Sequence, residues 1–402
     1  MLCNSINLDN CIKCSDCNAV CPVSIVYPAY PGPKNLGPEL ERLRLEGISC
    51  DTDWIEYCLN CYRCNLVCPN QVDISGMINM AKAHHKKPLI RKMRDFWFSR
   101  PWLLGRLLTI MPRLTNLMLN IRPVRLLMSR LLKISSNRIF PIYIDSDINV
   151  PIHDVPKSDS VIFFLGCSIR YNQPDLGRKV VLFLQRIGIK SVNIFSGCCG
   201  LPALANGDIK EARVRARSNT EYLIKDVLAG SFVVAACTSC GHMLKTCFDG
   251  LLDEDSDMKH KVQKIAKSTF DFGEFLMSRS DLFLFDNNIS SSNLRIAYHA
   301  PCHQISQGIG RPWFHLLKRI PNLQIEDLDA GCCGMSGTFG FKEEKYKISM
   351  DIGQRLFDSI RDVNPQMVVT ECATCRMQIE HGVKIKTIHP AELLLDLISA
   401  KT

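Results

Sequence analysis

The chain has 402 residues, of which 46% are hydrophobic, and it holds 21 cysteines. A chain of this length and apolar content can bury a core over about two to three domains, which excludes a disordered protein. The odd number of cysteines, and a beginning without an apolar stretch from Met1 to Asn10, favour a reducing compartment, where thiols stay free to bind metal. The formal charge of +9 has a local origin, because residues 86–133 hold twelve Lys and Arg against the single Asp95.

Two cysteine runs near the N-terminus share the spacing C-x-x-C-x-x-C-x-x-x-C-P. In this bacterial ferredoxin run, three close cysteines hold one [4Fe–4S] cluster and the fourth reaches across to the other cluster. By that rule one cluster takes Cys11, Cys14, Cys17 and Cys68, and the other takes Cys58, Cys61, Cys64 and Cys21. A pair of structural zinc sites is the alternative, but zinc leaves the third cysteine of each run and the following Pro unexplained. We therefore expect an α-helical ferredoxin-type domain over residues 1–85.

A basic connector without cysteines is expected over residues 86–155. From Pro101 leucines recur on one helical face with arginines on the other, and Pro112 should end or kink this helix before a second amphipathic one follows. Such helices lie in a membrane interface, at whose level Trp97 and Trp102 would sit, or they dock on a partner subunit or on the chain's own core. Nucleic-acid binding is not expected, since Leu and Met dominate the stretch. No stretch reaches the ~20 apolar residues of a membrane-spanning helix.

The C-terminal half repeats itself, with five cysteines in each copy. The first copy, expected over residues 156–290, has Cys167, Cys198, Cys199, Cys237 and Cys240, and the second, expected over 291–402, has Cys302, Cys332, Cys333, Cys372 and Cys375. Equivalent cysteines lie 134 or 135 residues apart, which indicates an internal duplication.

Short apolar runs precede the cysteines of each copy, and helical stretches separate these runs. The runs are residues 161–165, 192–195, 232–236, 295–298, 323–328 and 367–370, and the longest helical stretches are 207–228 and 342–360. This alternation predicts an α/β fold with a parallel sheet in each copy. Because ligands gather at the carboxyl ends of such strands, the five cysteines of one copy are expected to meet at one site.

Five converging thiolates exceed the four iron corners of a cube. Each copy would therefore bind a further iron–sulfur cluster, either non-cubane with a bridging cysteine or a cube with one spare thiol. The alternative makes Cys198 and Cys332 buried apolar fillers, but their recurrence in both copies argues against it. Glycines flank each cysteine pair and let the backbone come close to a cofactor.

Three histidines beside these cysteines would be ligands, proton relays or core residues: His242, His299 and His303. Three other cysteines fall outside every pattern and are expected to be plain thiols: Cys3, Cys50 and Cys247.

Two ferredoxin runs followed by two Cys-Cys-Gly (CCG) repeats resemble the iron–sulfur subunits of flavin dehydrogenases and heterodisulfide reductase. The stretches PGPKNLGPELER at residues 31–42 and TECATCRMQIE at residues 370–380 look like the C-subunit family of anaerobic glycerol-3-phosphate dehydrogenases. This resemblance implies a peripheral protein that attaches flavin-containing subunits to the cytoplasmic face of the inner membrane and delivers electrons to menaquinone. The basic, amphipathic residues 86–133 would be its contact with the membrane surface. It also implies that the eight ferredoxin-type and ten repeat cysteines are cluster ligands.

Two classes of function remain open. The first is an electron relay that is not catalytic alone, fed by a flavin on a partner, since the chain has no G-x-G-x-x-G fingerprint of its own. A glycolate or lactate oxidase iron–sulfur subunit would differ mainly in that partner. The second is an enzyme that reduces a disulfide at a CCG cluster, as heterodisulfide reductases do.

Overall fold

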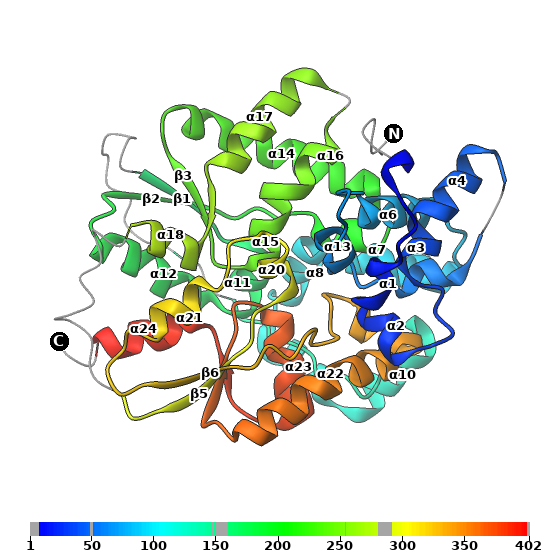
Figure 1. Cartoon of the computed structure of the whole chain (residues 1–402). Coiled ribbons are helices and arrows are strands. Elements are labelled where there is room, and N and C mark those ends of the chain that lie inside the picture. Colours follow the sequence, from blue (N-terminus) through cyan, green and yellow to red (C-terminus); the bar gives the residue numbers. More distant parts are fainter. Residues whose placement is uncertain are drawn as a thin grey trace.

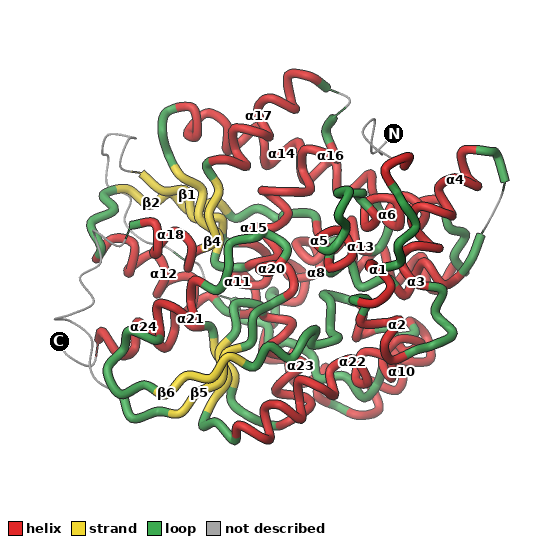
Figure 2. The backbone as a smooth tube through the Cα atoms, viewed as in Figure 1, coloured by secondary structure: helices red, strands yellow, loops and turns green. Residues whose placement is uncertain are grey.

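The computed structural model describes residues 8–48, 51–145, 148, 160–253, 255–279 and 292–399. Within these ranges, two four-stranded parallel sheets lie beside a helical N-terminal region (Figure 1). Figure 2 shows the strands in two separate groups, with only helices and loops in the N-terminal part. The expected α/β fold with a helical N-terminal domain is therefore confirmed. Cys3 and Cys50 lie outside the described residues.

Short helices build the N-terminal region around the two cysteine runs. They are η1 (Leu8–Asn10), α1 (Asp16–Ala19), α2 (Pro22–Val26), α3 (Gly32–Lys34), η2 (Asn35–Glu39), α4 (Leu40–Leu45), η3 (Asp53–Tyr57), α5 (Arg63–Leu66) and α6 (Ile74–His84). Their hydrophobic side chains pack with the cysteines and also with Cys332, Phe339 and Ile352 of the second repeat. The N-terminal region and the second repeat consequently share one core.

Four helices form the connector: α7 (Leu89–Phe98), α8 (Pro101–Leu108), α9 (Pro112–Asn120) and α10 (Arg122–Leu132). As predicted, the first amphipathic helix ends before Pro112, which begins α9 at a position where its missing N–H costs nothing. Helix α7 buries Arg94, Asp95 and Phe98, and α8 buries Gly105. Helices α9 and α10 bury no residue, although α10 packs against α7 and Asn116 of α9 bonds the backbone of Tyr143, so the second half of the connector is the more exposed half.

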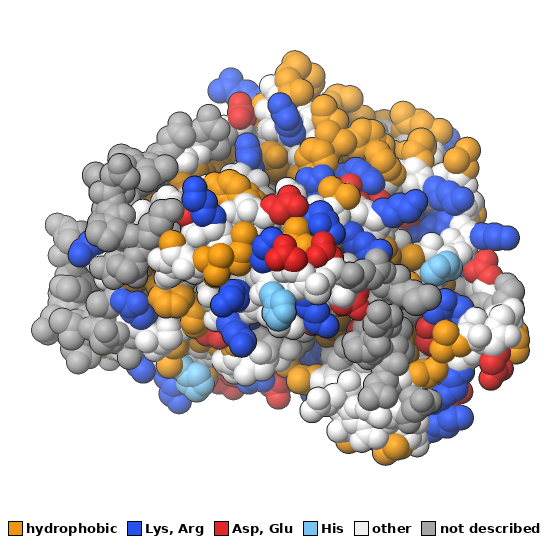
Figure 3. Space-filling model, turned by 90° about the horizontal axis from the view of Figure 1, so that it is seen from above, with side chains coloured by type: hydrophobic (Ala, Val, Ile, Leu, Met, Phe, Trp, Pro, Cys, Tyr) orange, Lys and Arg blue, Asp and Glu red, His pale blue; other side chains and the backbone are white. Residues whose placement is uncertain are grey.

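The connector exposes a row of large apolar side chains between its arginines. They are Leu107, Ile110, Met111, Leu114, Leu117, Met118, Leu126, Leu127 and Leu131. Exposed hydrophobic side chains also gather along one edge of the face in Figure 3, with Lys and Arg side chains beside them. No helix of the described ranges is long and apolar enough to cross a bilayer.

The first repeat forms a sheet of strand order β2-β1-β3-β4, in which every neighbouring pair is parallel. Its strands are β1 (Ser160–Phe164), β2 (Ser191–Phe195), β3 (Phe232–Ala235) and β4 (Thr269–Asp271). Its helices are α11 (Gly166–Asn172), α12 (Pro174–Arg186), α13 (Leu201–Ala205), α14 (Ile209–Leu228), α15 (Thr238–His242), η5 (Met243–Cys247), α16 (Phe248–Leu251), α17 (Ser256–Lys267) and α18 (Phe272–Ser278).

The second repeat has the same topology, with strand order β6-β5-β7-β8. Its strands are β5 (Arg295–Tyr298), β6 (Gln324–Asp327), β7 (Met367–Val369) and β8 (Thr387–Ile388). Its helices are α20 (Cys302–Ile305), α21 (Pro312–Leu317), η6 (Phe339–Phe341), α22 (Glu343–Val363), α23 (Ala373–Val383) and α24 (Pro390–Ser399). All six predicted strands are present within a residue of their expected bounds, and β4 and β8 are additional.

The two sheets share a central core. Val161 and Phe163 of β1 belong to the same buried cluster as Ile296 and Tyr298 of β5, whereas Phe164 faces a separate cluster on the outer side of its sheet. This follows from the period of two along a strand, which sends successive side chains to opposite faces. Helices α12, α18, α21 and α24 lie between the sheets, as Figure 1 shows. The cysteine loops that follow β5 and β6 pack against the N-terminal region, since Cys302 and Cys332 share its core.

Candidate iron–sulfur sites

Cysteines of the two ferredoxin runs come together in the crossed arrangement that the sequence predicts. Cys11, Cys14, Cys17 and Cys68 line one cavity, although Cys68 is remote from the other three in sequence. We call these four cysteines site A. The loop that carries the first three has non-glycine residues with positive φ, Lys13 at 60° and Ser15 at 74°. Such backbone is unusual, and it turns the thiols of one short loop toward a common centre.

The second run has the same backbone. Asn60 and Tyr62 have φ values of 56° and 59° at the positions equivalent to the two strained residues of the first run. Burial raises the pKa of the Cys21 thiol, and the nearby Cys58 raises it further. Burial also raises the pKa of the Cys64 thiol, with Cys58 and Cys21 adding to it. Site B, defined as Cys21, Cys58, Cys61 and Cys64, is therefore a second group of four thiols.

The five cysteines of the first repeat also converge, at the carboxyl ends of β1, β2 and β3. We call them site C: Cys167, Cys198, Cys199, Cys237 and Cys240. Hydrogen bonds join the thiols of Cys167 and Cys198, and Cys240 bonds both Cys199 and Cys237. The bond from Cys240 lowers the pKa of Cys237 to about 7, although burial opposes this. A thiol that ionises readily is a better metal ligand.

The second repeat brings together its own five, which we call site D: Cys302, Cys332, Cys333, Cys372 and Cys375. The Sγ atoms of Cys333 and Cys375 are 3.2 Å apart, and Cys302 is hydrogen-bonded to Cys332. Bonds from Cys332 and Cys375 lower the pKa of Cys333 to about 5 against the effect of burial. Because all nineteen described cysteines are free thiols, these donors suit a thiophilic metal cluster.

One glycine of each Cys-Cys-Gly motif is also required by the chain's own packing. Gly200 and Gly334 both have φ of 83°, a left-handed backbone that side chains disfavour. A Cβ on Gly334 would lie 2.1 Å from the carbonyl oxygen of Ser349 in α22. The motif therefore holds its cysteines against the long helix of each repeat.

Comparison with known proteins agrees with this architecture. Residues 7–72 match the model of a 4Fe-4S dicluster domain, and residues 161–245 and 296–380 match that of a cysteine-rich domain. Over 410 residues the chain is 34% identical to the C subunit of anaerobic glycerol-3-phosphate dehydrogenase from Escherichia coli (strain K12), a match over 98% of this chain and all of the relative. The chain belongs to this C-subunit family.

More distant relatives share part of the chain. Lactate utilization protein A of Geobacillus sp. (strain WCH70) is 27% identical, over 58% of this chain and 98% of the relative. The B subunit of fumarate reductase (CoM/CoB) from Methanothermobacter marburgensis is 28% identical, over 58% of this chain and 45% of the relative. Family membership, the matched domains and the gathered thiols together make this member of the C-subunit family an iron–sulfur protein of electron transfer, with two [4Fe–4S] clusters and iron–sulfur centres in the CCG repeats.

The four sites of this family member form a continuous series. Site A adjoins site B, since Cys17 contributes to the raised pKa of Cys64. Site B adjoins site D. Burial raises the pKa of Cys61 of site B, and the nearby Cys302 thiol of site D raises it further. Site D also adjoins site C. A hydrogen bond from Cys375 lowers the pKa of Cys372, while burial and the nearby Cys237 thiol of site C act to raise it. The spatial order is thus A, B, D, C, which differs from the order in sequence.

Arg63 is a functional residue that the sequence did not single out. Its half-buried guanidinium bonds the Cys302 thiol and lies near Cys332 and Cys61. Burial lowers the pKa of Arg63, but the surrounding thiolates outweigh burial and raise it. The cation therefore stays charged between sites B and D, where it stabilises negative charge.

The three histidines have different surroundings. His299 is buried, and its ring nitrogen lies within 4.8 Å of the Cys333 and Cys375 sulfurs. Burial, with Arg63 nearby, lowers its pKa to about 4. His242 and His303 instead stack on each other with ring centroids 5.1 Å apart, at the junction of the two repeats.

The polar partners of these stacked rings come from three parts of the chain. His303 bonds Ser239 at 2.8 Å and the carbonyl of Asn60 at 2.9 Å. His242 bonds Ser306 at 3.0 Å and lies 3.5 Å from the sulfur of Cys247, which also contacts the Tyr62 hydroxyl at 3.3 Å. Cys247, for which the sequence predicted a plain thiol, is a free thiol that contacts this junction.

Proposed function

We propose that this chain is the electron-transfer subunit of a flavin-dependent glycerol-3-phosphate dehydrogenase, in which it receives electrons from the flavin of partner subunits and passes them to a quinone. The observation that carries the proposal is the unbroken series of thiol sites A, B, D and C. When bound, iron–sulfur clusters accept and release single electrons. The chain would hold the four centres next to one another in the spatial order A, B, D, C. It would also bury most of their thiols from water and supply a fixed cation at Arg63.

The proposed ligands are the eighteen predicted cysteines. Sites A and B would each hold a [4Fe–4S] cluster on four thiolates, and sites C and D would each hold a further cluster on five. His299 offers site D a nitrogen donor that site C lacks, because Phe164 stands at the equivalent position. Location at the cytoplasmic face of the inner membrane is proposed from the apolar and basic connector, residues 86–133.

The function is tested by anaerobic purification of the chain with its native partners. We expect stoichiometric iron and sulfide, and reduction of the clusters by glycerol-3-phosphate only while the flavin subunits are bound. Paramagnetic resonance of the reduced sample follows each centre. Colourless, iron-free protein would overturn the proposal.

The alternatives are separated by the electron donor and acceptor. Reduction by lactate or glycolate in place of glycerol-3-phosphate would favour the partner suggested by the lactate utilization relatives. Turnover of a disulfide by the chain alone would favour a heterodisulfide-reductase-like enzyme.

The crossed ligation is tested by single substitutions. Cys68→Ser should remove the signal of site A and leave that of site B, while Cys21→Ser should do the reverse. Cys247→Ser is the matched control, since this half-buried thiol lies outside all four sites, and it should leave every signal in place.

A further inference from the structure

A cavity of about 710 Å³ lies between the connector helix α8 and the first repeat. Its volume is in the range of sites for small organic ligands, about 300–1,000 Å³. Trp102, Arg106 and Ile110 line it from α8 and the turn that follows, and Tyr171 and Phe195 line it from α11 and β2. Such a space next to a redox protein's thiol sites is a candidate for a ligand that exchanges electrons with them.

The cavity reaches the end of the series of thiol sites. Cys198 of site C is part of its wall. The carbonyl of Cys198 accepts a hydrogen bond of 2.9 Å from Asn219, which fixes the cysteine loop at the wall. A molecule in the cavity would therefore lie against the Cys198 loop of the last site in the series.

The aromatic walls are held rigidly. The Trp102 ring donates to Glu211 at 3.1 Å and lies 4.7 Å from the guanidinium of Arg215. Tyr171 packs against Gly105 of α8, where a Cβ would come within 2.3 Å of the ring. The Phe195 ring stacks on another ring outside the cavity, with centroids 4.2 Å apart. Fixed aromatic faces of this kind bind a flat ring system.

Cations and an apolar mouth complete the site. Arg106 and Arg170 line the cavity and can donate hydrogen bonds to carbonyl oxygens of a ligand. Ile110 belongs both to the cavity wall and to the exposed surface, with 68% of the residue accessible. It begins the exposed apolar row that continues through Met111 and Leu114. A ligand with an apolar tail could thus leave its tail along the face of the connector.

We infer that this cavity binds the ring of a quinone-class carrier, with its tail over the connector. The inference rests on the proposed electron-transfer function. It assigns the last step of that function, the reduction of the quinone, to this cavity. In that step the quinone takes up two electrons, delivered singly through the centres from the reduced flavin of the partner. Two protons from water join its two oxygens, and a quinol leaves.

The test uses the full chain with its clusters and the soluble quinone menadione. Ser218→Trp places a large ring in the cavity from an exposed position of α14, and Arg106→Gln removes the charged guanidinium from its wall. Both variants should weaken menadione binding, and slow reoxidation of dithionite-reduced clusters by menadione, by about tenfold or more. Val214→Trp, on an exposed position of the same helix outside the cavity, should change neither.

The outcomes separate this inference from the proposed function. If wild type binds menadione and both cavity variants bind it equally well, the site is elsewhere and the inference is wrong. If inorganic phosphate displaces menadione from wild type, the arginines form an anion site and the inference is also wrong. If no quinone reoxidises wild-type clusters that glycerol-3-phosphate has reduced, the proposed acceptor itself fails.

Discussion

The Arg63 guanidinium lies between two sets of thiols that are far apart in the sequence, Cys61 of site B and Cys302 of site D. It cannot lose its proton in the neutral range. Reduction of a cluster adds one negative charge, so a fixed cation beside it stabilises the reduced form. Arg63 is thus placed to raise the reduction potentials of both neighbouring centres together.

We expect Arg63→Gln to lower the potentials of the centres at both site B and site D by on the order of 50–100 mV, from the Coulomb energy of one charge beside each centre in a medium of intermediate dielectric. Arg63→Lys keeps the charge and should restore most of the difference. Potentiometric titration followed by paramagnetic resonance measures it. Arg361→Gln, at an exposed pair, is the control. Equal potentials in wild type and Arg63→Gln would contradict the argument.

Among the residues that build the sites, the sequence predicted the cysteines and few of the residues around them. The cysteine spacing is readable because each run folds locally around its own centre. The roles of Arg63 and Cys247 depend on neighbours that tertiary packing brings from other parts of the chain, since Arg63 contacts Cys302 of the second repeat and Cys247 contacts Tyr62 of the N-terminal region. A cation inside a cysteine run is a weak signal of such a role. For His299 the sequence left three roles open: ligand, proton relay and core residue. Its position next to Cys333 makes it a candidate ligand of site D.

The connector has two kinds of surface: α8 packs on the first repeat, whereas α9 and α10 expose apolar side chains. Trp102 does not sit at an outer face, as a membrane-level tryptophan would, but packs on the first repeat through Glu211. Helices α9 and α10 carry exposed leucines instead, with Arg125 and Arg130 among them. Apolar and cationic side chains on one face are the combination that binds anionic lipid.

We expect the double variant Leu117→Gln and Leu127→Gln to weaken binding to phosphatidylglycerol vesicles by about tenfold or more, since each leucine loses roughly 1 kcal/mol of burial in lipid. Co-sedimentation with the vesicles measures the effect. Leu228→Gln is the matched control, because this leucine is 64% exposed on α14, away from the connector. Unchanged sedimentation of the double variant would exclude these helices as the contact.

The sequence predicted the positions of those strands that lie in the longer apolar runs. Strands β4 and β8 were missed because three and two residues are too few to show a period. The connector was left undecided because amphipathic spacing is the same for a helix on lipid and a helix on protein. The structure divides it, with α8 on the protein and α9 and α10 exposed.

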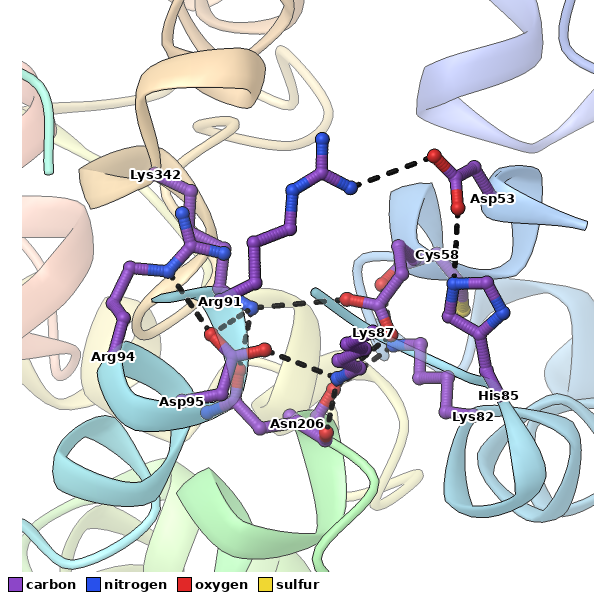
Figure 4. Close-up of polar contacts among 12 residues, drawn as sticks. Asp53, Cys58, Lys82, His85, Lys87, Arg91, Arg94, Asp95, Asn206 and Lys342 are labelled. Atoms are coloured by element: carbon purple, nitrogen blue, oxygen red, sulfur yellow. Dashed lines mark hydrogen bonds and ion pairs between the residues drawn. The ribbon is translucent and has the colours of Figure 1, made fainter. Parts of the chain in front are cut away.

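All parts of the molecule meet at a buried group of charges, shown in Figure 4. Lys87 contacts Glu56 at 2.9 Å and Asp95 at 3.0 Å, and Lys342 contacts Asp95 at 3.0 Å. Both lysines also bond Asn206, at 2.9 and 2.8 Å. These residues come from the N-terminal region, the connector and both repeats, so the group fixes their relative positions.

A second set of contacts ties the same group to site B. Lys82 donates to the carbonyl of Cys58 at 2.9 Å, and Lys345 contacts the Glu56 carboxylate at 3.4 Å. Burial would raise the pKa of Glu56, but Lys345, Lys342 and Lys87 hold it well below 4.5. A depressed carboxylate pKa stabilises the fold at every pH above the unfolded value.

Glu56→Gln should therefore destabilise the protein by about 3–5 kcal/mol, because it leaves buried lysines without their counter-charge. The melting temperature of the clustered protein under anaerobic conditions should fall by roughly 5 °C or more, equally at about pH 6 and pH 8, since Glu56 is ionised at both. Asp358→Asn, which breaks an exposed ion pair, should leave it unchanged. An unaltered melting temperature in Glu56→Gln would show that the charge group does not hold the parts together.

Of the nineteen cysteines that the structure describes, Cys14 alone is exposed. The series of centres thus has one corner open to solvent, at the end opposite the quinone cavity. An iron atom at that corner would meet dioxygen first whenever no other protein covers it. We expect the chain made by itself in air to bleach from site A inward, and co-synthesis with the flavin subunits to protect it.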